Sequence, residues 1–237
     1  MKYPTRDGWT LGIDAYAGQG LIDFAALRQE ANAQFAILQA STGSRGADVF
    51  FAPNAKRARE AGLLVGAYHV LRPAEGAAAQ VEQFNKIALT GNNHISMRPM
   101  CDVELIKGAT YGQLAQVLKD WCAGVAEAWG CRVIVYSYPS FLAELHKAAP
   151  VAMASVAMTC DLLIAHYGPP KPTIPAPWTH AQGWQFDGNG GLKLPNGVDA
   201  DFNWFFGEAA ALRETWGWPA ESPSDEASDP EEETECA

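Results

Sequence analysis

Two acidic residues, separated by one residue, lie at the end of an apolar stretch in MRPMCDVELIKG (97–108). In a β-strand, residues i and i+2 point to the same face, so Asp102 and Glu104 are expected to face one cleft. Two carboxyl groups in one low-dielectric site push their pKa values apart, so that one stays protonated while the other ionises. With aromatic rings nearby, such a pair suits glycoside hydrolysis, although a solvated strand end or a metal-binding pair fits the same spacing.

Other polar and aromatic residues lie at the ends of further apolar runs. In a barrel of parallel strands, active sites lie at the carboxyl ends of the strands, so such residues are expected to converge there. Together with the acidic pair, they predict a cleft lined by carboxylates and aromatic rings. In chain order they are Asp14, Tyr68, His69, Tyr136, Tyr138, Trp184, Gln185, Asp187, Asp199 and Asp201.

Eight apolar, β-rich runs predict strands, and helical patterns separate the first six of them. The strands are expected over 9–16, 34–42, 63–71, 96–105, 131–138, 161–168, 180–187 and 197–205. The helices are expected over 22–32, 52–62, 75–89, 110–130 and 139–149. No helix is expected after residue 161, where GPPKPTIPAPW (168–178) holds five prolines. Five βα units followed by strands alone suggest an α/β barrel.

Charge is distributed unevenly along the 237 residues, whose net charge is −10. Residues 221–237 hold eight acidic residues and no basic one, which leaves 19 acidic against 17 basic residues over 1–220. The nearly neutral body argues against nucleic acid as a partner. We expect one catalytic domain over residues 1–215 and an acidic, disordered tail over 216–237.

No apolar run is long enough to span a bilayer, and MKYPTRDGWTLGIDAY (1–16) lacks the apolar segment of a signal peptide. The chain is therefore expected to be made in the cytoplasm and not to insert into a membrane. Its five cysteines are scattered, without a CxxC pair or metal-like spacing. We expect a monomer that uses no metal ion and no other cofactor.

GIDAYAGQGLIDFAAL (12–27) resembles the opening of glycoside hydrolase family 25, the Chalaropsis-type lysozymes. The resemblance implies an irregular TIM-like (β/α)5β3 barrel. It also implies an N-acetylmuramidase, which cuts the β-1,4 bond between N-acetylmuramic acid and N-acetylglucosamine in peptidoglycan. The resemblance continues through residues 41–71, CDVE (101–104), VIVYSY (133–138), LIAHYG (163–168), WQF (184–186) and VDADFNWFFG (198–207).

The four acidic residues of that family fall, by position, on Asp14, Asp102, Glu104 and Asp199. By this resemblance Glu104 is the general acid that protonates the leaving oxygen. Asp102 orients the 2-acetamido group or stabilises the developing positive charge, while Asp14 and Asp199 hold the network. Asp201, two residues beyond Asp199, is the alternative for the fourth acid. Inversion and acetamido participation are both open as mechanisms.

Five further residues are candidates for contact with the sugars, and a core position is the alternative for the aromatic ones among them. They are Tyr16, Tyr68, Tyr136, Trp184 and Gln185.

Four residues are expected to support the structure rather than to react. His69 is expected to be a hydrogen-bonded neighbour of the site, and Asp23 to cap the first helix. Asp48 and Asn54 are expected to fix the loop before the second helix. One departure from the family also concerns the cleft, because Gln39 stands where an Arg or Lys is usual in the second strand.

Two other functions fit parts of the sequence. DGNGGL (187–192) follows the seventh strand, where many barrels bind phosphate, so an enzyme of a phosphorylated metabolite is one alternative. A hairpin turn explains these glycines better. The second alternative is a catalytically inactive barrel that binds glycan or a protein. The expected setting is a phage endolysin for host cell lysis, held in the host cytoplasm until its release to the cell wall or periplasm.

Overall fold

The structure is a computed structural model that describes residues 2–89, 93, 95–188 and 190–219. All eight predicted strands and all five predicted helices are present, while β3, α6, α7 and a 3-10 helix over Ala17–Gln19 are additional. The strands are β1 (Thr10–Ala15), β2 (Phe35–Thr42), β3 (Gly46–Ala47), β4 (Leu64–Val70), β5 (Met100–Asp102), β6 (Val133–Ser137), β7 (Cys160–Ala165), β8 (Gly183–Asp187) and β9 (Asp201–Phe205). The helices are α1 (Phe24–Ala31), α2 (Phe51–Glu60), α3 (Ala77–Ala88), α4 (Tyr111–Trp129), α5 (Pro139–Ala148), α6 (Pro150–Thr159) and α7 (Ala209–Trp216).

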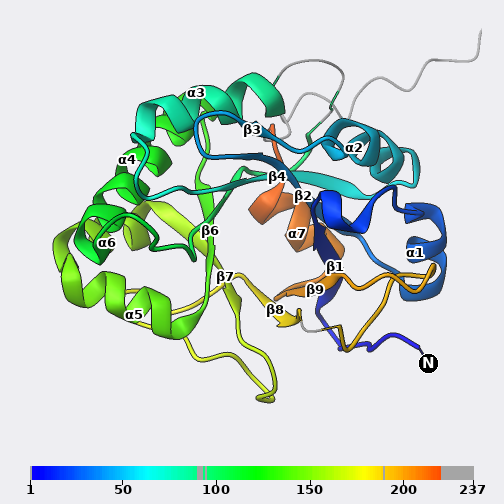
Figure 1. Cartoon of the computed structure of the whole chain (residues 1–237). Coiled ribbons are helices and arrows are strands. Elements are labelled where there is room, and N and C mark those ends of the chain that lie inside the picture. Colours follow the sequence, from blue (N-terminus) through cyan, green and yellow to red (C-terminus); the bar gives the residue numbers. More distant parts are fainter. Residues whose placement is uncertain (1, 90–92, 94, 189, 220–237) are drawn as a thin grey trace, which may run out of the picture.

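The strands close into a barrel, because β1 pairs with β2 on one side and with β9 on the other. Apart from β3, neighbouring strands from β1 to β8 are parallel. Strand β9 is antiparallel to β8 and β1, and the short β3 is antiparallel to β2. Helices lie around the outside of this barrel (Figure 1). Five βα units followed by strands that no helix separates confirm the predicted (β/α)5β3 architecture.

Helix α4 shows how the sequence sets the helical layer. It begins at a capping box, in which the Thr110 side chain accepts from the Gln113 backbone and the Gln113 side chain accepts from the Thr110 backbone. It ends at Gly130, whose φ of 65° is the left-handed conformation that glycine adopts without strain. Its apolar residues recur every three or four positions and face the barrel, as expected of a helix that covers a sheet. They are Leu114, Ala115, Leu118, Trp121, Cys122, Val125 and Trp129.

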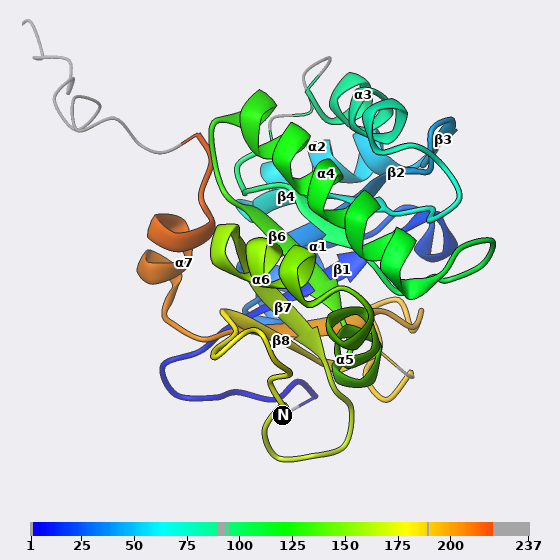
Figure 2. The ribbon, with the colours of Figure 1, turned by 90° about the vertical axis from the view of Figure 1, so that its left-hand side faces the viewer.

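Helix α7 corrects the prediction that no helix follows residue 161. Its Trp216 is fully buried, with ring centroids 6.3 Å from Phe35 and 5.0 Å from Phe205. Phe35 begins β2 and Phe205 ends the antiparallel β9, so α7 closes the end of the barrel where the parallel strands start (Figure 2).

The folded body extends beyond the boundary predicted at residue 215. Trp218 lies against Trp129, with ring centroids 4.6 Å apart, and Gly217 pairs with Met97 as an isolated bridge. The boundary at 215 was therefore placed too early. Most of the predicted tail, residues 220–237, lies outside the described residues.

Helix α6 was also not predicted. It follows α5 directly, and its Pro150 occupies the first helical position, where the missing N–H costs nothing.

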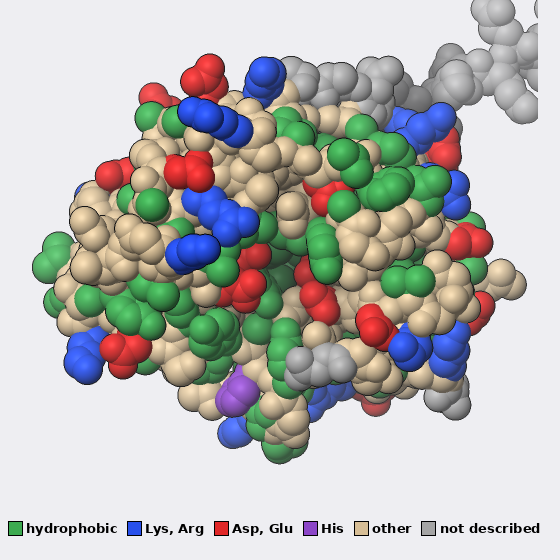
Figure 3. Space-filling view, viewed as in Figure 1, with side chains coloured by type: hydrophobic (Ala, Val, Ile, Leu, Met, Phe, Trp, Pro, Cys, Tyr) green, Lys and Arg blue, Asp and Glu red, His purple; other side chains and the backbone are tan. Residues whose placement is uncertain are grey.

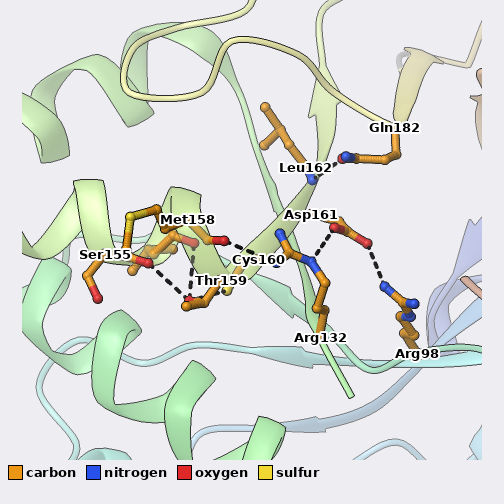
Figure 4. Close-up of polar contacts among 10 residues, drawn as sticks. Arg98, Arg132, Ser155, Met158, Thr159, Cys160, Asp161, Leu162 and Gln182 are labelled. Carbon is orange, nitrogen blue, oxygen red and sulfur yellow. Dashed lines mark hydrogen bonds and ion pairs between the residues drawn. The ribbon is translucent and has the colours of Figure 1, made fainter. Parts of the chain in front are cut away.

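An ion cluster ties together the starts of β5, β6 and β7 (Figure 4). The buried Asp161 accepts from Arg98 at 3.1 Å and from Arg132 at 2.8 Å, with one oxygen for each arginine. Arg132 also donates to the Met158 carbonyl at 3.0 Å. The cluster lies at the end of the barrel opposite to the carboxyl ends of the parallel strands, so it supports the fold rather than the cleft.

Candidate active site

A cleft of about 300 Å³ opens at the carboxyl ends of the parallel strands. Figure 3 shows this face hollowed in the middle, with acidic side chains around the hollow and basic ones beside it. We call it the acidic cleft. Its lining residues are Asp14, Tyr16, Gln39, Thr42, Tyr68, Val70, Arg72, Met100, Asp102, Glu104, Tyr136 and Asp201.

Asp14 lies at the floor of the acidic cleft, on β1. Its Oδ2 accepts two hydrogen bonds of 2.7 Å, from Gln185 Nε2 and from Asn203 Nδ2. Burial raises the pKa of Asp14 to about 6, and these two donors act against that rise because they stabilise the ionised form. Asp14 can therefore change protonation near neutral pH.

Asp102 ends β5 and is buried. Its Oδ1 has no hydrogen-bond partner among the described residues. Burial, and then the charges of Glu104 and Asp14, raise the pKa of Asp102 well above its usual range. An unpaired buried carboxyl oxygen is costly, so this atom is available to a donor on a ligand.

Glu104 lies at the mouth of the cleft, two residues beyond the end of β5. The strand is shorter than the predicted 96–105, yet Asp102 and Glu104 both line the cleft, as their spacing predicted. Partial burial raises the pKa of Glu104.

Asp201, and not Asp199, joins these three acids. Asp201 begins β9 beside Asp14 and lines the cleft, and burial raises its pKa to about 8. The side chain of Asp199 is 62% exposed and pairs with Lys193 Nζ at 2.5 Å. The position expected for the fourth acid is therefore corrected by two residues. The catalytic roles of all four acids stay predictions.

Four acids in one partly dry cleft do not all ionise together. Like charges at short range and desolvation both disfavour the charged forms, so the group titrates as a coupled set. Such a set keeps a proton on one carboxyl group at neutral pH while another is ionised. That is the condition for general acid catalysis next to a stabilising carboxylate.

The predicted sugar-binding residues divide into two groups. Tyr16, Tyr68 and Tyr136 line the acidic cleft, and Tyr16 is exposed at its edge. Trp184 lies on the outer face of the barrel, where its Nε1 donates to the His166 carbonyl at 2.8 Å and its ring contacts Trp9. It does not line the cleft.

Gln185 is a supporting residue rather than a wall of the cleft. It is 1% exposed, and its Oε1 accepts from the hydroxyls of Tyr136, at 2.8 Å, and Tyr167. Through its Nε2 it links these two tyrosines to Asp14. The structure thus places Gln185 behind Asp14, away from a bound sugar.

A second hollow, of about 660 Å³, lies on the other side of Glu104. We call it the tyrosine hollow. It shares Glu104 and Tyr136 with the acidic cleft, and the prediction did not include it. Its lining residues are Glu104, Tyr136, Tyr138, Pro139, Ser140, Ala165, His166 and Tyr167. Tyr138, which the sequence placed at the cleft, directly follows β6, and Tyr167 comes two residues after the end of β7, a position that could have signalled it.

His69 is hydrogen-bonded as predicted but does not line the cleft, and Asp23 is a helix cap as predicted. His69 is fully buried, 2.8 Å from Ser41 Oγ and 3.1 Å from Gln80 Oε1, and burial lowers its pKa to about 4. Asp23 accepts from the Ala26 N–H at 3.0 Å and caps α1.

Asp48 makes the contacts predicted in the loop before α2, whereas Asn54, which lies within α2, holds the loop before α1 instead. Asp48 accepts from the N–H groups of Ala17 and Phe50, at 2.6 and 2.8 Å. Asn54 accepts from the Ile22 N–H at 3.1 Å.

The glycines of DGNGGL lie in the connection between β8 and β9, which are antiparallel neighbours. Lys193, the base in this connection, is paired with Asp199. Among the residues that the structure describes, no group of three or more His, Cys, Asp or Glu side chains could hold a metal ion. No described helix is long and apolar enough to cross a membrane.

A barrel that gathers four carboxyl groups in one tyrosine-lined cleft, at the carboxyl ends of its parallel strands, has side chains suited to glycoside hydrolysis. Comparison with known proteins agrees. The family model of glycosyl hydrolases family 25 matches residues 13–193. The chain belongs to this family.

Three relatives illustrate the likeness. The autolytic lysozyme of Clostridium acetobutylicum is 29% identical over 193 residues, which are 80% of this chain and 54% of that protein. Lysozyme M1 of Streptomyces globisporus is 27% identical over 218 residues, which are 88% of this chain and 72% of that protein. The crystal structure of a lysozyme from Streptomyces coelicolor shares the fold, with a TM-score of 0.74 at 24% identity, and the match covers 89% of this chain and 98% of that one. This chain thus spans about half the length of the Clostridium relative.

Proposed function

We propose that this chain is an N-acetylmuramidase that cuts the β-1,4 bond from N-acetylmuramic acid to N-acetylglucosamine in peptidoglycan. The observation that carries the proposal is the position of Glu104, which lines both the acidic cleft and the tyrosine hollow. A glycan strand that runs from one to the other brings a glycosidic oxygen to this carboxyl group. The lysozyme relatives support the same reaction.

Glu104 is the general acid in this proposal. The raised pKa of Glu104 favours the protonated form, which donates its proton to the leaving oxygen. Positive charge develops on the sugar ring as the bond breaks. Asp14, Asp102 and Asp201 line the cleft around that ring, and an ionised carboxylate among them stabilises the charge.

Asp102 holds the 2-acetamido group of the sugar in the acidic cleft. Its buried Oδ1 is without a partner in the described part of the chain, and an acetamido N–H is a donor that pairs with it. Binding of the correct sugar therefore relieves an unpaired oxygen, which a sugar without the acetamido group does not do.

The test is incubation with purified peptidoglycan, followed by identification of the new reducing ends. Muramic acid at these ends supports the proposal. Glucosamine at these ends would show a different bond specificity, and binding without any new reducing end would show an inactive barrel.

The biological setting is lysis of a bacterial host cell by an endolysin that is kept from the wall until the membrane is opened. The proposed activity supports this setting, because an active muramidase in contact with the wall would lyse the cell early. Expression in the bacterial cytoplasm tests it. Lysis should follow only when a membrane-permeabilising agent is added, and spontaneous lysis of untreated cells would contradict it.

A further inference from the structure

The acidic cleft and the tyrosine hollow differ in charge. Arg72 is the basic residue that lines the acidic cleft, whereas no lysine or arginine lines the tyrosine hollow. The two sites meet at Glu104, so a glycan strand bound across them contacts two chemically different surfaces. This asymmetry indicates that the sugar in the acidic cleft carries the anionic substituent.

Arg72 is held in place by contacts that leave its outer nitrogens free. Its Nε donates to Thr42 Oγ1 at 3.0 Å. Gln80 fixes its backbone from both sides, because Gln80 Oε1 accepts from the Arg72 N–H at 2.8 Å and Gln80 Nε2 donates to the Arg72 carbonyl at 3.0 Å. In the part of the chain that the structure describes, the guanidinium makes no ion pair. Its outer N–H groups can therefore take a ligand carboxylate in a two-point contact.

The charge of Arg72 reaches the catalytic acids. Burial raises the pKa of Asp102 most strongly, and Arg72 acts in the opposite direction. A ligand group that pairs with Arg72 is therefore bound beside the sugar on which Asp102 acts.

Glu75 lies in the same loop as Arg72. Hydrogen bonds from Ser44 lower the pKa of Glu75 most strongly, and the charges of Arg72 and Arg45 act in the same direction. Glu75 is thus already held by Ser44. Gly108 lies against Ala74, so the exposed Lys107 belongs to a loop that meets the loop of Arg72.

Peptidoglycan offers the matching anions. N-acetylglucosamine is neutral, whereas N-acetylmuramic acid carries a lactyl group whose carboxyl is either free or joined to a peptide stem with carboxylates of its own. Cleavage after muramic acid places that sugar in the acidic cleft, which is where Arg72 lies.

We infer that Arg72 binds a carboxylate of the substituent on the muramic acid residue and makes the enzyme prefer peptide-bearing glycan. This inference rests on the proposed function. A single exposed pair of this kind corresponds to about a fivefold preference.

The test compares kcat/KM on three substrates of the same strand length. They are peptide-bearing glycan, the same glycan with its stem carboxylates converted to neutral amides, and glycan stripped of peptides by an amidase. The wild-type enzyme should prefer the first over the second about fivefold, mainly through KM, and the preference should weaken with salt. In Arg72→Gln the preference should fall below about twofold, while Arg72→Lys should retain more of it than Arg72→Gln.

Arg59→Gln is the matched control, because Arg59 is exposed on α2 and lines neither the cleft nor the hollow. It should keep the wild-type preference. A preference for the stripped glycan that is lost in Arg72→Gln would overturn the preference for peptide-bearing glycan and would show that Arg72 binds the lactyl carboxylate instead.

Two further outcomes overturn the inference: equal kcat/KM on all three substrates, or a preference that Arg72→Gln retains. Absence of muramic acid reducing ends from all three substrates with the wild-type enzyme would instead overturn the proposed function.

Discussion

Gln185 Nε2, on β8, donates a 2.7 Å hydrogen bond to Asp14 Oδ2, on β1, although the two residues are 171 positions apart in the sequence. The bond orients the carboxylate at the floor of the cleft and links it to Tyr136 and Tyr167. The geometry of Asp14 therefore depends on a residue that has no access to the sugar.

Replacement of Gln185 by leucine should lower kcat on purified peptidoglycan by about 10- to 100-fold, as is usual when a partner that orients a functional group is lost. The change removes one of the two donors to Asp14 and the acceptor of two tyrosine hydroxyls. Gln182→Leu is the control, because Gln182 precedes the same strand and accepts from the Leu162 N–H outside the cleft. Equal kcat values for the two variants would remove Gln185 from the account.

Asp201→Asn and Asp199→Asn form a matched pair that tests the position of the fourth acid. Asp201 lines the cleft, whereas Asp199 is an exposed partner of Lys193. Asp201→Asn should lower kcat by at least about tenfold, because one preorganised carboxylate is lost. Asp199→Asn should change kcat less than about twofold, as for an ordinary surface pair. The reverse order would restore Asp199 to the site.

The cleft acids should also make stability depend on pH. The pKa of Asp14 is raised from 3.8 to about 6, and that of Asp201 from 3.8 to about 8. The folded protein thus holds protons that the unfolded chain releases, so this stabilisation is complete below pH 3.8 and is lost as pH rises through about 6 and about 8.

Asp201→Asn removes one of these acids and should raise the melting temperature at pH 9 relative to the wild type, by an amount equivalent to about 1 kcal/mol or more. The gain should be smaller at pH 5. Thermal unfolding at both pH values measures it, and Asp199→Asn should show no such pH-dependent gain. A gain that is equal at both pH values would contradict the shifted pKa of Asp201.

Removal of Asp161 should destabilise the fold without affecting the chemistry. Asp161→Asn leaves Arg98 and Arg132 without their shared carboxylate, and we expect a loss of about 1–3 kcal/mol, reduced from the buried-pair value because Arg132 is partly exposed. Denaturant unfolding measures this loss, and Glu30→Gln, in an exposed pair with Lys2, should cost less than about 1 kcal/mol. A fall in kcat of the folded Asp161→Asn enzyme would contradict the placement of this cluster at the far end of the barrel.

The sequence predicted the site best where a strand leads directly into the cleft. Asp14 and Asp102 lie on strands, and the rule that active sites lie at the carboxyl ends of barrel strands was sufficient to place them. The order of apolar runs and helical patterns likewise predicted the barrel, because the helical patterns separate only the first six of the eight runs.

Prediction was weaker where a shift of one position along a strand decides which side chain points into the barrel. Trp184 and Gln185 are neighbours on β8, so they point to opposite sides of the sheet, and the sequence does not state which side is inward. Asp199 and Asp201 are two positions apart, so the alternation of faces along a strand could not separate them, and only the structure shows that β9 begins at Asp201. Helix α7 was missed because its burial depends on Trp216 meeting Phe35 and Phe205, contacts between segments that are distant in the chain.

The central claim is that Glu104 donates the proton at the junction of the acidic cleft and the tyrosine hollow. The most direct measurement is the kcat of Glu104→Gln on purified peptidoglycan, with melting temperature as the check on folding. The substitution keeps the shape of the side chain and removes its ionisable proton, so kcat should fall by at least about 100-fold with little change in melting temperature. A folded Glu104→Gln enzyme with kcat near that of the wild type would contradict the account.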